Sequence, residues 1–183
     1  MTYLNRFKQI SDEAANSIYS LVKDMINKNT TNILEVGTYA GQVTVLLAAA
    51  AKEESSSVNV ISIDENNDNF SPSAQESLKV SNLFNTSVES GDLDRRFEEN
   101  IVRANIIYID RFHDEIESKI EIIKKNVIVP TKVIFRNPKN SSDFPFEISE
   151  VAPVVKPRAR KKSTITEEPV DKTITKETKK ETT

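Results

Sequence analysis

The chain has 183 residues, with 25 Lys and Arg against 28 Asp and Glu, one His, no Cys and no Trp. This length predicts one domain with room for an appendage. The absence of cysteine excludes a disulfide framework, a thiolate metal site and a cysteine nucleophile. No apolar run approaches the roughly 18 residues of a membrane span, and the N-terminus lacks a signal-peptide apolar core. We therefore expect a soluble, cytoplasmic protein with no membrane partner.

Residues 151–183 differ in composition from the rest of the chain. They contain no aromatic residue, and their 9 Lys and Arg against 5 Asp and Glu give a net charge of +4, which leaves −7 for residues 1–150. Such a segment buries too little apolar surface to offset the entropy of ordering it. We predict a folded domain over residues 1–150 and a disordered, charged, low-complexity tail over residues 151–183.

The charge distribution also bears on partners. An acidic domain argues against a core that binds nucleic acid. The basic run at residues 156–162 is either a solvated linker, a contact for an anionic surface such as nucleic acid, or a nuclear-type address.

The first predicted element is an N-terminal helix over residues 11–28. Ser11 is a candidate N-cap, and Asp12 and Glu13 fall in the first turn, where the helix dipole favours acidic groups. Apolar residues from Ala14 to Ile26 recur at three- and four-residue spacing, which is typical of one buried helix face.

Short apolar strands then alternate with helical patterns. Strands are predicted at 33–36, 58–64, 86–90, 105–110, 132–135 and 144–149, and helices at 42–52, 73–83 and 114–126. This alternation predicts an α/β fold: a doubly wound, mostly parallel, Rossmann-like sheet with helices on both faces. Ligands bind such sheets beyond the carboxyl ends of the strands. Gly37, Asp64, Gly91 and Asp110 lie at those ends.

Two of the three glycines, Gly37 and Gly41, flank the turn after the first predicted strand. A P-loop is excluded because Gln42, and not Lys, follows Gly41. A dinucleotide fingerprint is excluded because Tyr39 replaces its middle glycine. The remaining form, Glu-x-Gly-x-x-x-Gly, suits a nucleoside without phosphates or an ordinary strand-to-helix connection.

The segment Glu-Val-Gly-Thr-Tyr-Ala-Gly-Gln-Val-Thr at residues 35–44 resembles the first motif of class I S-adenosylmethionine-dependent methyltransferases. The family's other motifs follow in order. Asp64 ends the second predicted strand, Gly91 and Asp92 follow the third, and Asp110 ends the fourth. Residues 109–113 are similar to the Ile-Asp-Gly-x-His segment of a branch that contains small-molecule O-methyltransferases. The resemblance spans about residues 30–137.

The resemblance implies S-adenosylmethionine as the cofactor and transfer of its methyl group to an oxygen or nitrogen of a small-molecule acceptor. Asp64 would accept hydrogen bonds from the ribose hydroxyls, and Asp92 would accept one from the adenine amine. Glu35 and Asp110 would place negative charge near the ligand's ammonium and sulfonium. The implied cofactor-binding set is Glu35, Gly37, Thr38, Gly41, Asp64, Gly91 and Asp92.

The candidate catalytic residues are Asp110 and His113, with His113 as a general base. Each assignment has a structural alternative. Asp64 and Asp110 could be capping or loop residues, Asp92 could form an Asx turn, and His113 could belong to the first turn of a helix.

This sequence also departs from the family pattern. Arg111 stands where the family has glycine after the aspartate, and Asn137 is the single candidate ligand after the fifth predicted strand. We therefore expect no bound metal. Because a fold does not settle function, the alternative is a catalytically inactive methyltransferase-fold subunit of a larger assembly, for example a viral particle. Its 151–183 tail would then contact a protein partner.

Overall fold

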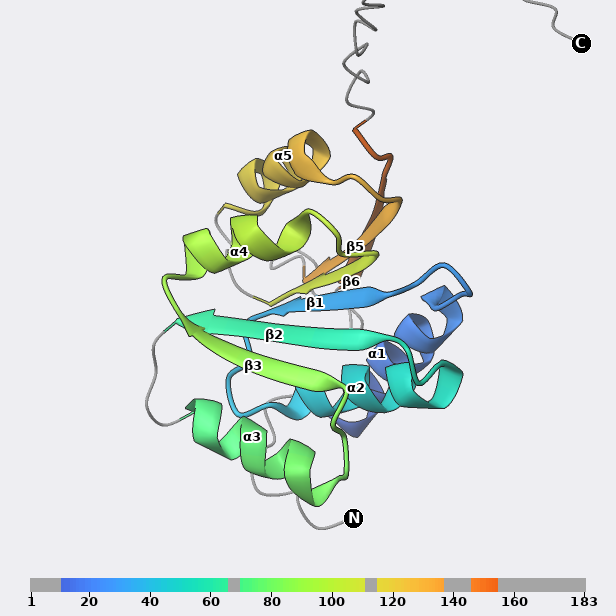
Figure 1. The fold of residues 1–183 in the computed structure, drawn as a ribbon, viewed down its shortest axis with the longest axis vertical. Helices are drawn as coiled ribbons and strands as arrows, with labels where there is room; N and C mark the ends of the chain where they lie inside the picture. The colour runs from blue at the N-terminus through green and yellow to red at the C-terminus, as the bar shows by residue number, and fades with distance from the viewer. Residues whose placement is uncertain (1–10, 66–69, 111–114, 137–145, 155–183) are drawn as a thin grey trace, which may run out of the picture.

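The computed structural model describes residues 11–65, 70–110, 115–136 and 146–154. Figure 1 shows their arrangement. The elements, in chain order, are α1 (Asp12–Met25), β1 (Asn32–Val36), α2 (Gln42–Glu54), β2 (Asn59–Glu65), α3 (Phe70–Val80), β3 (Thr86–Gly91), α4 (Leu93–Ile101), β4 (Ile106–Ile109), α5 (Ile116–Asn126), β5 (Thr131–Arg136) and β6 (Phe146–Val151).

The strands form one six-stranded sheet in the order β3-β2-β1-β4-β5-β6. All neighbouring strands are parallel except β6, which runs antiparallel to β5. The chain builds outward from β1 to β3 and then returns to add β4 on the other side of β1. The reversal of strand order therefore lies between β1 and β4, where doubly wound sheets bind ligands. The predicted α/β fold class is confirmed.

Helices cover both faces of this sheet, with α1, α2 and α3 on one side and α4 and α5 on the other (Figure 1). Successive residues of a strand point to opposite faces, and the two cores follow that alternation. Ile33 of β1 belongs to the core under α1 and α2, whereas its neighbour Leu34 belongs to the core under α4 and α5. By this parity Glu35 lies on the α2 face.

The N-terminal helix begins where the sequence predicts. The Ser11 hydroxyl accepts a hydrogen bond from the Ala14 amide at 3.1 Å, so Ser11 is the N-cap. The helix ends at Met25, three residues before the predicted end, because Ile26 has extended backbone angles (φ −70°, ψ 133°).

One helix was not predicted. The nine-residue α4 begins at its N-cap Asp92 and buries Leu93, Phe97 and Ile101 against the sheet. Those three side chains are spaced four apart, which is the signal of a single narrow apolar face.

The described part of the domain extends slightly beyond residue 150. β6 ends at Val151, and the Val154 amide donates a hydrogen bond to the Val127 carbonyl at 2.8 Å. The tail from residue 155 onward lies outside the described residues, so the predicted boundary and the disorder of the tail stay predictions. In the described ranges, no helix has the length and apolar character to cross a membrane.

Gly41 allows α3 to pack against the turn that precedes α2. Its φ is 84°, and a Cβ atom at this position would lie 2.6 Å from the Cβ and 2.7 Å from the Cα of Ala74. A side chain here would therefore meet both a backbone conformation that L-residues disfavour and a backbone contact that cannot yield cheaply. The glycine is required by packing, whatever ligand the turn binds.

We predict that Gly41→Ala lowers the free energy of unfolding by about 4 kcal/mol, from overpacking combined with left-handed strain. Gly91→Ala is the control, since Gly91 has a φ of 144° but the nearest atom to its added Cβ is 4.0 Å away. That variant should lose about 1–3 kcal/mol, from backbone strain alone. Urea denaturation measures both, and equal losses would contradict the packing explanation.

Candidate functional site

The turn after β1 is a compact, mostly buried structure. The Gly37 amide donates to the Ile63 carbonyl of β2 at 2.9 Å, and the Gly41 amide donates to the Thr38 carbonyl at 2.8 Å. Gly37 has a φ of 106°, a conformation that glycine adopts without strain. The turn is thus fixed at one end to β2 and closed on itself at the other.

Beneath this turn lies the fully buried carboxyl group of Glu35. Its Oε2 accepts hydrogen bonds from the hydroxyls of Thr44 and Ser62, each at 2.5 Å. The Ser62 hydroxyl also lies 2.6 Å from the Thr38 hydroxyl. This Glu35 network, made of Glu35, Thr38, Thr44 and Ser62, ties β1, β2, α2 and the turn together.

The other oxygen of the Glu35 carboxyl, Oε1, is buried without a hydrogen-bond partner. Buried polar atoms are nearly always hydrogen-bonded, so such an atom calls for an explanation. Burial raises the pKa of Glu35 to about 8, against the lowering effect of the Ser62 and Thr44 hydroxyls and with further raising by Asp110 and Asp64. Burial therefore favours the protonated form of this carboxyl, whereas its hydrogen bonds from Ser62 and Thr44 favour the ionised form.

Asp64 is only 4% exposed and lies against the same turn. Its Oδ2 accepts from the Tyr39 amide and its Oδ1 from the Glu65 amide, both at 2.8 Å. The strand alternation puts Asp64 on the same sheet face as Ser62 and therefore as Glu35. The structure thus brings Asp64 and the Gly37–Gly41 turn together on one side of the sheet.

Tyr39 is a site residue that is not among those predicted from the sequence. It has a positive φ of 45°, which is uncommon for a bulky residue and is often found at functional sites. Its amide donates to Asp64, and its hydroxyl donates to the Asp110 carbonyl oxygen at 3.1 Å. Tyr39 therefore connects the carboxyl ends of β1, β2 and β4. The available signal was a large residue placed between two glycines in a tight turn.

Ser62 and Thr44 were also not predicted as site residues. Ser62 interrupts the otherwise apolar run of β2 and is completely buried, as is Thr44 in the first turn of α2. A hydroxyl inside a buried apolar strand, two residues before an aspartate, was the sequence signal for a polar cluster.

Gly91 and Asp92 lie at the same edge of the sheet, since Gly91 pairs with Glu65 in the strand register. The exposed Asp92 is the N-cap of α4, and its Oδ1 accepts from the Arg95 amide at 3.1 Å. This contact gives Asp92 a structural role. Its predicted contact with the adenine amine stays a prediction.

Asp110 follows β4, and its amide donates to the Val36 carbonyl at 2.9 Å. It is half-buried and close enough to Glu35 to raise the pKa of that carboxyl. His113 and Arg111 fall in residues 111–114, outside the described residues, so the predicted base stays a prediction. Within the described ranges no group of three or more His, Cys, Asp or Glu side chains is arranged to hold a metal ion.

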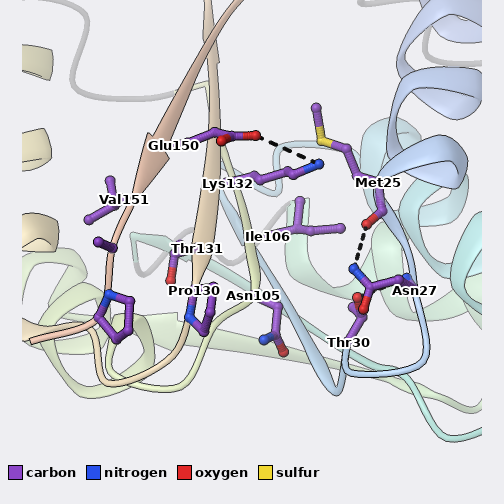
Figure 2. A pocket seen from close by; sticks show the side chains of 12 residues that line it. Met25, Asn27, Thr30, Asn105, Ile106, Pro130, Thr131, Lys132, Glu150 and Val151 are labelled. Atoms are coloured by element: carbon purple, nitrogen blue, oxygen red, sulfur yellow. Dashed lines mark hydrogen bonds and ion pairs between the residues drawn. The ribbon is translucent and has the colours of Figure 1, made fainter. Parts of the chain in front are cut away.

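A cleft of about 480 Å³ lies at the opposite edge of the sheet. It is lined by residues at the starts of β4 and β5, among them Ile106 and Lys132, with Met25 at the end of α1 facing them (Figure 2). The Lys132 Nζ lies 3.9 Å from Oε1 of Glu150, its register partner on the adjacent strand β6, and both line the cleft. The cleft is therefore separate from the site at the carboxyl ends of the strands.

Comparisons with known proteins agree with this architecture. An O-methyltransferase from Bacillus cereus, solved in complex with SAH, is 21% identical to this chain, with a TM-score of 0.59. The match covers 75% of this chain and 64% of the Bacillus cereus chain. The O-methyltransferase TomG from Streptomyces achromogenes, solved with SAM, is 16% identical to this chain, with a TM-score of 0.58. The match covers 73% of this chain and 63% of the TomG chain. These likenesses show that the chain shares the fold of these O-methyltransferases.

No family model matches the sequence. A curated relative, an uncharacterized RNA methyltransferase of Mycoplasma mobile, is 27% identical over 133 residues, which make up 72% of this chain. The match covers 34% of that relative, so the chain spans about a third of its length.

The raised pKa of Glu35 predicts how stability depends on pH. Between pH 4.5 and about 8 the folded protein keeps a proton on Glu35 that the unfolded chain has lost. The contribution of Glu35 to the free energy of unfolding is therefore greatest at low pH. It falls by about 1.4 kcal/mol per pH unit as the pH rises toward 8. Glu35→Gln, which cannot ionise, should remove this part of the slope. Urea unfolding from pH 5 to 9 measures the difference, and parallel curves would contradict the prediction.

Proposed function

We propose that this chain binds S-adenosylmethionine across the Gly37–Gly41 turn and transfers its methyl group to an oxygen or nitrogen of a small acceptor. The observation that carries the proposal is the Glu35 carboxyl, buried below the turn with Oε1 unpartnered and with Asp64 and Asp110 near it. Three acidic groups at the carboxyl edge of a doubly wound sheet fit a ligand that bears positive charge. The two ligand-bearing O-methyltransferases described above share this fold.

Different residues of the site would contact different parts of the ligand. Asp64, held by the amides of Tyr39 and Glu65, would accept from the ribose hydroxyls, and Asp92 would lie toward the adenine at the end of β3. The Gly37 backbone would lie against the methionyl part. Glu35 and Asp110 would face its ammonium and sulfonium. When bound, the cofactor supplies an already activated methyl group.

The protein's own contribution is then mainly positional. Such a transfer requires the acceptor atom to be aligned with the donor and water to be kept out. Tyr39, which joins the ends of β1, β2 and β4, would keep this edge in one conformation. A hydroxyl acceptor also needs a base, the role we propose for His113 with Asp110 beside it.

RNA is a second candidate acceptor. The relative from Mycoplasma mobile is named as an RNA methyltransferase, and residues 156–162 carry five Lys or Arg in seven positions. Such a basic run would attract a phosphate backbone. The net charge of −7 on residues 1–150 favours a small acceptor instead.

The inactive alternative differs in the transfer step. A scaffold subunit that has kept the fold could still bind the cofactor, but it would transfer no methyl group to any acceptor. Its role would then depend on a protein partner of residues 151–183. Labelled-methyl transfer to small acceptors and to RNA separates these possibilities.

Calorimetric titration tests the cofactor proposal directly. We expect micromolar binding of S-adenosylmethionine and of its demethylated product. Asp64→Asn should weaken binding by about 10–100-fold, because a hydrogen bond to a charged group contributes about 1.5–3 kcal/mol. Glu65→Gln is the matched control, since Glu65 is the exposed next residue of β2 and should bind like the wild type. No heat at millimolar ligand would overturn the proposal, provided that thermal unfolding shows each variant to be folded.

A further inference from the structure

The Oε1 atom of Glu35 has no hydrogen-bond partner, and this bears on the protonation state of the carboxyl. The carboxyl is completely buried, and its two hydrogen bonds both go to Oε2. Oε1 receives none. If the carboxyl were ionised, Oε1 would carry negative charge without a hydrogen bond to stabilise it. Burying such a charge costs free energy.

The groups around Glu35 come from four parts of the fold. α2 contributes the Thr44 hydroxyl, β2 contributes Ser62 and Asp64, and the turn contributes Thr38 and Tyr39. On β4, Tyr108 pairs with Glu35 in the strand register, and Asp110 follows two residues later. Among the described residues, the charged groups that act on Glu35 are therefore acidic.

Resting on the proposed function, we propose that Glu35 is protonated in the free protein and releases its proton when the cationic cofactor binds. The O–H bond of the carboxyl breaks, the electron pair stays on the carboxylate, and the proton passes to the solvent. The ligand's ammonium or sulfonium then compensates the charge, which the protein alone does not. Cofactor binding is thereby coupled to pH through one buried side chain.

The direction of the coupling follows from linkage. Burial raises the pKa of Glu35 to about 8 in the free protein, and a nearby positive charge favours the ionised form. The bound state thus holds fewer protons than the free state below pH 8. Affinity should therefore increase as the pH rises toward 8 and then level off.

The test is calorimetric titration with S-adenosylmethionine at pH 7 in two buffers that differ in ionisation enthalpy. The wild type should release close to one proton per bound ligand, and its Kd should fall by up to tenfold per pH unit between pH 6 and 8. Glu35→Gln should bind without proton release and with a flat pH profile. The neutral nucleoside 5′-methylthioadenosine, which lacks both cations, should release no proton from the wild type.

Ser62→Ala provides a second variant should Glu35→Gln fail to fold. It removes one of the two hydroxyls that stabilise the carboxylate, so the pH at which affinity levels off should move upward. Wild-type binding without proton release overturns the inference, as does equal release from Glu35→Gln or with 5′-methylthioadenosine. A level-off point unmoved by Ser62→Ala also overturns it. An absence of binding at every pH overturns the proposed function as well, so the two failures are distinguishable.

Discussion

The site depends on a carboxyl group placed inside an apolar strand. Burying Glu35 costs free energy unless the group is hydrogen-bonded or neutralised, and the fold supplies hydroxyls from α2 and β2 for one of its oxygens. The Ser62 hydroxyl also contacts the Thr38 hydroxyl in the turn. The Glu35 carboxyl, which would destabilise the core without these hydrogen bonds, therefore fixes the position of the turn relative to β2 and α2. The remaining site contacts depend on that position.

Strand order explains why these residues meet. Because β1 lies between β2 and β4, the carboxyl ends of all three strands are adjacent at the reversal of the sheet. Tyr39 uses this adjacency, since it contacts Asp64 on one side and the Asp110 carbonyl on the other. One residue in a left-handed conformation is thus held by two neighbouring strands, which offsets its local strain.

Sequence patterns predicted the fold well because buried parallel strands are continuous apolar runs, as in β1, β2 and β4. They missed α4, whose apolar residues are only Leu93, Phe97 and Ile101 among charged neighbours. They also placed Gly37, Asp64, Gly91 and Asp110 at the carboxyl ends of the strands, because strand ends are readable from sequence. The Ser62 contact was not readable, since 27 residues separate Ser62 from Glu35 and the pairing depends on the strand register.

The structural and ligand-binding interpretations of the acidic residues are not exclusive. Asp64 accepts from the Tyr39 and Glu65 amides and Asp92 caps α4, and a binding group needs such support to keep its orientation. These contacts stabilise the free protein, so an active enzyme and an inactive subunit would both retain them. The unpartnered Glu35 Oε1 is different, because it gives the free protein no stability. The Oε2 atom of the same carboxyl holds the turn through the Thr44 and Ser62 hydroxyls, so the two oxygens of Glu35 differ in what they do for the free protein. Oε2 stabilises the fold, and Oε1 is the atom that the cationic ligand we propose would compensate.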